Sequence, residues 1–195
     1  MVELKSVKLS ENENIIVHGR TIESRDPAYL VWSGSSIEMN VKASELQILI
    51  EGEYDYQENW IAIEINGEII SRRMISKEKE WITIFRNINP ENIVNVKIIN
   101  EVQAMNLDSH HCIKVYEVKL DGEILPVEKK DLKIEFIGDS ITSAEGTIGA
   151  KKEMDWISMF FSHTRSYPYL VSKKLDAEYK IVSQSGWGAF HSWDN

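Results

Sequence analysis

The stretch Trp60-Ile-Ala-Ile-Glu-Ile-Asn-Gly67 indicates a β fold for the first two thirds of the chain. Isoleucine occupies every second position from Ile61 to Ile65, which is the period of a strand with one face in a core. Asn66-Gly67 follows directly, and this dipeptide accepts the positive φ that a type I′ turn needs at both central positions. The stretch therefore predicts the first strand and the turn of a β-hairpin.

The same pattern extends in both directions, from residue 5 to about residue 127. Residues 36–41 and 93–99 also alternate polar with apolar side chains, and Asp121-Gly122 predicts a second hairpin. No segment in this part has a helical period. About nine or ten short strands separated by polar turns predict an all-β sandwich of the jelly-roll type.

The pattern changes beyond the sandwich. Residues 132–137 predict a strand, Ser166 is suited to cap the start of a helix, and residues 179–183 predict a second strand. A strand, a helix and a strand in succession indicate the start of a parallel α/β sheet. We therefore expect a jelly-roll-like β-sandwich domain over residues 1–128 and part of an α/β domain over residues 129–195. The apolar residues on one face of the predicted helix are Tyr167, Leu170, Val171 and Leu175.

Composition excludes several classes of partner. The chain has 195 residues, with 22 Lys and Arg against 31 Asp and Glu, for a net charge of −9. This acidic balance argues against nucleic-acid binding, which needs a basic surface. No apolar run is long enough to span a membrane, so we expect no membrane partner. The N-terminus has no signal-peptide pattern, which indicates a cytoplasmic protein, or a secreted one if a leader was removed.

Cysteine and histidine give no sign of a metal or disulfide. Cys112 is the only cysteine, so an intrachain disulfide and a cysteine-based zinc site are excluded. His18 and His163 have no carboxylate or histidine neighbour at the spacing of metal ligands. We expect no metal and no cofactor.

The stretch Gly138-Asp-Ser-Ile-Thr142 follows the predicted strand 132–137 and suggests a nucleophile. A serine hydroxyl needs a fixed, exposed position beside a base and an oxyanion hole. The carboxyl end of a parallel strand supplies such a position, and Ser140 lies there. The alternative is a plain strand-to-helix turn in which Ser140 caps a helix. The amide of Ser140 is also a candidate oxyanion donor.

A second signal, Ser183-Gln-Ser-Gly-Trp-Gly188, follows the next predicted strand. Gly186 would present its amide to the same crevice and serve as a second oxyanion donor, although a plain glycine turn is the alternative. Trp187 and Trp193 flank the crevice and are candidates for stacking on sugar rings; packing beneath another part of the fold is equally open.

These two signals together resemble the first two conserved blocks of the SGNH/GDSL hydrolases. The segments 19–21 and 32–38, with residues 135–140, resemble the family 2 carbohydrate esterases (acetyl xylan esterase type). The resemblance implies a β-jelly-roll joined to a flavodoxin-like SGNH hydrolase domain that removes acetyl groups from polysaccharides. It also implies that Ser140 is the nucleophile and that the amides of Ser140 and Gly186 form part of the oxyanion hole.

The family pattern is incomplete here. Its third block, which provides an Asn donor, and its last block, which provides the general-base His, have no counterpart after Gly188. Asp108-Ser-His-His111 spells Asp-x-x-His but precedes the nucleophile, so we interpret it as chance. We expect His191 to lie on a surface loop; a position at the mouth of the crevice is the alternative. A companion C-terminal segment is therefore expected to complete the hydrolase domain, and the 195-residue chain alone is expected to be inactive.

We thus predict an N-terminal portion of a serine esterase that acts on acetylated carbohydrate by Ser-His catalysis. Two other functions stay open. The β-sandwich could be a carbohydrate-binding or assembly module with an inert hydrolase remnant, or the site could belong to an SGNH lipase or thioesterase that cleaves small esters.

Overall fold

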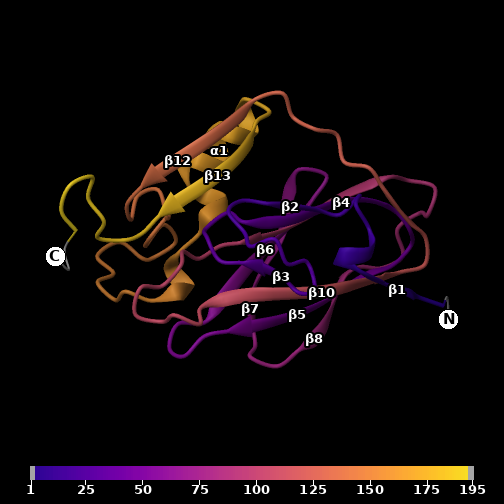
Figure 1. Cartoon of the computed structure of the whole chain (residues 1–195), viewed down its shortest axis with the longest axis horizontal. Coiled ribbons are helices and arrows are strands. Elements are labelled where there is room, and N and C mark those ends of the chain that lie inside the picture. Colours follow the sequence, from indigo (N-terminus) through magenta and orange to yellow (C-terminus); the bar gives the residue numbers. More distant parts are fainter. Residues whose placement is uncertain (1–2, 193–195) are drawn as a thin grey trace.

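The computed structural model describes residues 3–192, and its larger part is a sandwich of two antiparallel sheets (Figure 1). The first sheet runs in the order β1 (Lys5–Lys8), β10 (Cys112–Leu120), β5 (Leu46–Glu53) and β8 (Glu80–Phe85), with β3 (Ala28–Leu30) also paired to β10. The second runs β11 (Glu123–Leu125), β4 (Ser36–Lys42), β9 (Val94–Asn100), β6 (Asn59–Ile65) and β7 (Glu68–Ile75), with β2 (Ile16–His18) paired to β4. The predicted β-sandwich is confirmed.

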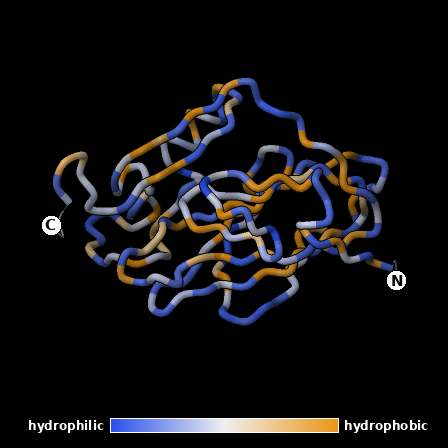
Figure 2. The backbone as a smooth tube through the Cα atoms, viewed as in Figure 1, coloured by the Kyte–Doolittle hydropathy of each residue, from blue (hydrophilic) through white to orange (hydrophobic). Residues whose placement is uncertain are grey.

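One apolar core lies between the two sheets. Every second residue of β5 is buried, as the period of a strand with one covered face requires. Ile48 and Ile50 from this strand pack in one cluster with Ile37 and Ile98 of the second sheet. Figure 2 shows hydrophobic stretches along the strands of the sandwich and again along the last strands of the chain.

The two predicted hairpins have different outcomes. Asn66 and Gly67 have φ values of 50° and 82°, and they connect the paired strands β6 and β7 as a type I′ turn should. The second prediction is wrong, because β10 and β11 belong to different sheets. Asp121 accepts hydrogen bonds from the amides of Ser44 (2.8 Å) and Glu45 (3.0 Å) and guides the chain from one sheet to the other.

The last third of the chain forms a parallel unit on the outside of the sandwich (Figure 1). Strand β12 (Lys133–Gly138) pairs in parallel with β13 (Glu178–Ser183), and helix α1 (Tyr167–Lys174) lies between them in sequence. Ser166 caps the helix by accepting a hydrogen bond from the Tyr169 amide. The predicted strand, helix and parallel strand are confirmed. Short 3₁₀ helices are Leu9–Glu11, Ser158–Phe160 and His163–Arg165.

Helix α1 rests on the sandwich by its less apolar face. Tyr169 packs against Ala62 and Ile99 on the outer side of the second sheet. The apolar face that the sequence singled out is instead at least 39% exposed at each of Tyr167, Leu170, Val171 and Leu175. Ile137 of β12 is 76% exposed. Within residues 3–192, no helix is long and apolar enough to cross a membrane.

Candidate functional site

The site lies at the carboxyl ends of β12 and β13. Gly138 and Ser183 are register partners at the ends of these two parallel strands, so the loops that follow begin side by side. The Gln184 amide donates a hydrogen bond to the Gly138 carbonyl (3.3 Å), and the Ser143 hydroxyl donates one to the Ser183 hydroxyl (2.8 Å). The two segments predicted from sequence to carry chemistry are thus neighbours.

The loop that carries Ser140 is held by its own backbone. Asp139 accepts a hydrogen bond from the Ile141 amide at its side chain (3.0 Å), and its carbonyl accepts one from the Ser143 amide (3.0 Å). Ser140 itself is half-buried. Its hydroxyl makes no hydrogen bond to any residue between 3 and 192.

Gly138 is required by the tight fold of this loop. A Cβ atom at this position would lie 2.1 Å from the Thr142 hydroxyl oxygen, far inside van der Waals contact. That hydroxyl is in turn within hydrogen-bond distance of the Tyr167 hydroxyl (3.0 Å), which ties the loop to the start of α1. Only glycine allows Thr142 to come this close to the end of the strand.

Gly186 lies in a tight turn after β13. The Trp187 amide donates to the Gln184 carbonyl (3.1 Å), and Gly186 has a φ of 79°. A positive φ at the third position alone, with this hydrogen bond, is typical of a type II turn, which favours glycine there. Gly186 is exposed.

A hollow of about 340 Å³ adjoins this turn. It is formed between a loop of the sandwich, represented by Asn106 and Leu107, and Trp156 and Glu145 of the later part of the chain. The residues of the turn that line it are Gln184, Ser185 and Gly186. The sequence analysis did not predict Asn106, Leu107 and Trp156 as site residues. These residues meet only through tertiary packing, and no local sequence pattern marks them.

Of the two candidate tryptophans, Trp187 belongs to the described residues. Trp187 is 40% exposed and packs edge to face against Trp32 of the sandwich, with ring centroids 6.5 Å apart. This contact gives Trp187 a structural role, while part of its surface stays accessible. Trp193 lies outside the described residues.

Within residues 3–192, none of the five histidines makes a hydrogen bond to Ser140. His163 is completely buried and its Nε2 lies 2.8 Å from the Tyr179 hydroxyl; burial lowers the pKa of His163 to about 3. His111 lies 3.0 Å from the Asn59 side chain, and Asp108 accepts hydrogen bonds from backbone amides. His191 is exposed, and within residues 3–192 its ring makes no hydrogen bond.

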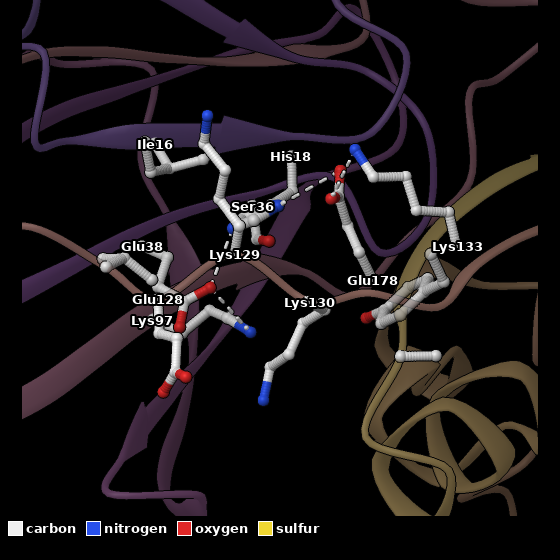
Figure 3. Close-up of a pocket in the computed structure, with 13 residues that line it drawn as sticks. Ile16, His18, Ser36, Glu38, Lys97, Glu128, Lys129, Lys130, Lys133 and Glu178 are labelled. Carbon is white, nitrogen blue, oxygen red and sulfur yellow. Dashed lines mark hydrogen bonds and ion pairs between the residues drawn. The ribbon is translucent and has the colours of Figure 1, made fainter.

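A seam of charged residues joins the sandwich to β13 (Figure 3). His18 lies 2.7 Å from the Glu38 carboxylate on one side and 3.9 Å from the Glu178 carboxylate on the other. Burial alone would raise the pKa of Glu38, but the hydrogen bond with His18 and the charge of Lys97 outweigh it, so this pKa falls to about 2. A pocket of about 200 Å³ opens along the seam.

A second link is fully buried. The Glu101 carboxylate accepts hydrogen bonds from the Thr164 amide (2.9 Å) and hydroxyl (2.7 Å), and burial raises the pKa of Glu101. Arg72 stands 3.8 Å away. These contacts fix the segment that precedes α1 to the loop after β9. Within residues 3–192, no group of three His, Cys, Asp or Glu residues could hold a metal ion.

Two similar proteins of known structure share the fold of this chain. An acetyl xylan esterase (Est2A) from the rumen bacterium Butyrivibrio proteoclasticus superposes with a TM-score of 0.95 at 39% identity, over 98% of this chain and 52% of that chain. A family two carbohydrate esterase from Cellvibrio japonicus superposes with a TM-score of 0.83 at 25% identity, over 100% of this chain and 56% of that chain. The chain therefore spans about half the length of these relatives.

The sequence comparisons agree. The cellulase/esterase CelE of Acetivibrio thermocellus is 26% identical over 187 residues, which are 91% of this chain and 21% of CelE. The family model described as carbohydrate esterase 2 N-terminal matches residues 17–127, more than half of the chain. The suggested resemblance is thus confirmed, and the chain belongs to the carbohydrate esterase 2 N-terminal family.

Proposed function

We propose that this chain is the nucleophile-bearing portion of an SGNH-type serine esterase that removes acetyl groups from polysaccharides or oligosaccharides. In this proposal residues 1–128 are the jelly-roll-like domain and residues 129–195 begin the hydrolase domain. The observation that carries it is the pairing of Gly138 with Ser183, because it brings the Ser140 loop and the Gly186 turn to one edge of a parallel sheet. The similarity to the acetyl xylan esterase Est2A supports the choice of an acetyl ester.

The proposed reaction has two halves. The Ser140 oxygen attacks the acetyl carbonyl while a base takes its proton, and the carbonyl electrons move to an oxygen held by the amides of Ser140 and Gly186. The intermediate collapses, the sugar oxygen leaves with the proton, and Ser140 carries the acetyl group. Water then attacks this ester in the same way and releases acetate. No cofactor is required.

The base is proposed to come from a C-terminal segment that completes the hydrolase domain. His18, His110, His111 and His163 each pair with another side chain, and His191 makes no hydrogen bond to Ser140 among residues 3–192. The exposed apolar residues Ile137, Leu170 and Leu175 support a covering segment, since parallel sheets are normally buried on both faces. We refer below to the chain together with this segment as the complete protein.

Acetate release tests the proposal. The complete protein is incubated with acetylated xylo- or manno-oligosaccharides, and its turnover is compared with that of Ser140→Ala. Loss of the nucleophile should reduce kcat on the order of 10⁴- to 10⁶-fold. Ser71→Ala is the matched control, because Ser71 is exposed on β7 in the sandwich.

Two outcomes would reject the acetyl-carbohydrate proposal. Preference for 4-nitrophenyl esters of long acyl chains over acetylated sugar would favour a lipase or thioesterase. Absence of any Ser140-dependent hydrolysis, together with retained binding of the oligosaccharide, would favour a carbohydrate-binding module.

A further inference from the structure

One side chain of the sandwich reaches the turn that contains Gly186. Gln103 follows β9 and is completely buried. Its Oε1 atom accepts a hydrogen bond from the Ser185 amide (2.8 Å) and another from the Ser185 hydroxyl (3.0 Å). The two residues are 82 positions apart in the chain, so this contact is made entirely by the packing of the later segment on the sandwich.

Ser185 determines how the Gly186 amide is presented. The peptide bond between Ser185 and Gly186 is the central peptide of the type II turn, and its N–H group is the proposed oxyanion donor. Type I and type II turns differ by a flip of this central peptide, and glycine accepts both conformations. Ser185 precedes this peptide, and its two hydrogen bonds to Gln103 hold it through both the backbone amide and the side-chain hydroxyl.

The orientation of the Gln103 amide is fixed by chemistry. An amide N–H can only donate, so Ser185 requires the oxygen of Gln103 and not its nitrogen. The Nε2 atom is buried and has no hydrogen-bond partner among residues 3–192. Buried polar atoms without partners are uncommon in folded proteins. An apolar side chain would pack at this position without leaving a buried polar atom unpaired. We therefore infer that Gln103 stabilises the structure through its oxygen atom.

The same loop has a second anchor nearby. Glu101, two residues earlier, holds the Thr164 amide and hydroxyl. The loop after β9 therefore binds the later segment both before α1, at Thr164, and after β13, at Ser185. Of these two hydrogen-bonded contacts, the one made by Gln103 reaches the turn of the candidate site.

We propose that Gln103 is a positioning residue for the oxyanion hole, supplied by the β-sandwich to the hydrolase portion. By fixing Ser185 it keeps the Gly186 amide directed at the developing oxyanion before substrate arrives. The inference rests on the proposed function, and it gives the sandwich a role in catalysis. Preorganised donors matter because removal of one typically lowers kcat on the order of 10²- to 10³-fold.

The test compares two substitutions in the complete protein. Gln103→Leu has a similar size but no acceptor, whereas Gln103→Glu keeps an oxygen in reach of Ser185. We expect Gln103→Leu to lower kcat by about 10- to 100-fold with KM changed less than about twofold, as for loss of transition-state stabilisation. Gln103→Glu should recover most of this loss. Gln47→Leu, on β5 of the first sheet, is the matched control.

A second measurement does not depend on activity. Amide hydrogen exchange of the 195-residue chain should show a protected Ser185 amide that loses protection in Gln103→Leu and keeps it in Gln103→Glu. An unchanged kcat in Gln103→Leu, a rise in KM alone, or a Gln103→Glu variant as slow as Gln103→Leu would overturn the role of Gln103. Wild-type protein without Ser140-dependent hydrolysis would instead overturn the proposed function on which this role rests.

Discussion

Glu38 lies in the seam between the sandwich and β13, and its charge is held by residues of the sandwich, so its removal should destabilise the fold. The carboxylate is 11% exposed, accepts from the Asn95 side chain (3.0 Å), and pairs with Lys97 (3.1 Å) and His18 (2.7 Å). Its pKa falls from the ordinary value of 4.5 to about 2. Since one pH unit of pKa difference is worth about 1.36 kcal/mol, the charged form adds about 3 kcal/mol to the folded state at neutral pH.

The pH dependence follows from the direction of this shift. A carboxyl group with a lowered pKa contributes its full stability above the unfolded value of 4.5 and loses it as the pH falls toward 2. Glu38→Gln should therefore reduce the free energy of unfolding by up to about 3 kcal/mol at pH 7. The difference between variant and wild type should shrink between pH 4.5 and pH 2.

Urea unfolding followed by circular dichroism measures this difference at each pH. Glu91→Gln is the control, because Glu91 pairs with Lys42 at 3.1 Å but is 78% exposed, and such surface pairs contribute less than about 1 kcal/mol. A Glu38→Gln variant as stable as Glu91→Gln at pH 7 would show that the charge of Glu38 does not stabilise the fold. A destabilisation that persisted at pH 2 would show that lost packing, not lost charge, is responsible.

Four further predictions follow from the structure. Gly138→Ala should abolish most esterase activity of the complete protein, because its Cβ would meet the Thr142 hydroxyl at 2.1 Å; activity above about a tenth of wild type would contradict this. Cys112 is buried beside Glu53, and burial first and then this carboxylate raise its pKa to about 12, so a thiol reagent should label it only after unfolding. Residues 1–128 should fold alone, with a β-type circular dichroism spectrum and a cooperative melt. The isolated 195-residue chain should hydrolyse 4-nitrophenyl acetate no faster than its Ser140→Ala variant, since its base is proposed to lie elsewhere.

Local chemistry explains which parts of the fold could be predicted. Asn66-Gly67 predicted its hairpin because the turn depends only on the φ values that these two residues accept. Asp121-Gly122 has a similar composition, yet the Asp121 carboxylate binds the backbone of Ser44 and Glu45 across the sandwich. Tertiary contacts there outweigh the preference of the dipeptide, and no pattern within the turn reveals them.

For helix α1, the start could be predicted from the sequence but the packing surface could not. Ser166 predicted its start, because capping is a contact between residues three positions apart. The apolar face of Leu170 and Leu175 would ordinarily predict burial against the nearest core, but the helix contacts the sandwich through Tyr169. The sequence pattern identifies an apolar face; it does not identify the surface that covers it.

The parts of the candidate site that depend on strand order could be predicted from the sequence. The parts that depend on tertiary packing could not. Ser140 and Gly186 follow two strands whose parallel pairing the sequence already indicated, so their loops were expected to meet. Gln103 and Leu107 belong to a loop of the sandwich with no motif, and only the docking of the later segment brings them to the Gly186 turn. The role of each predicted residue in catalysis stays a prediction.

Ser140 is proposed to be the nucleophile of an esterase. Treatment of the complete protein with a fluorophosphonate, followed by peptide mapping, tests it most directly, because this reagent modifies only an activated serine. We predict a single adduct on Ser140, absent from Ser140→Ala and unchanged in Ser71→Ala. Labelling that survives Ser140→Ala, or wild-type protein that takes up no label at all, would show that Ser140 is not the nucleophile.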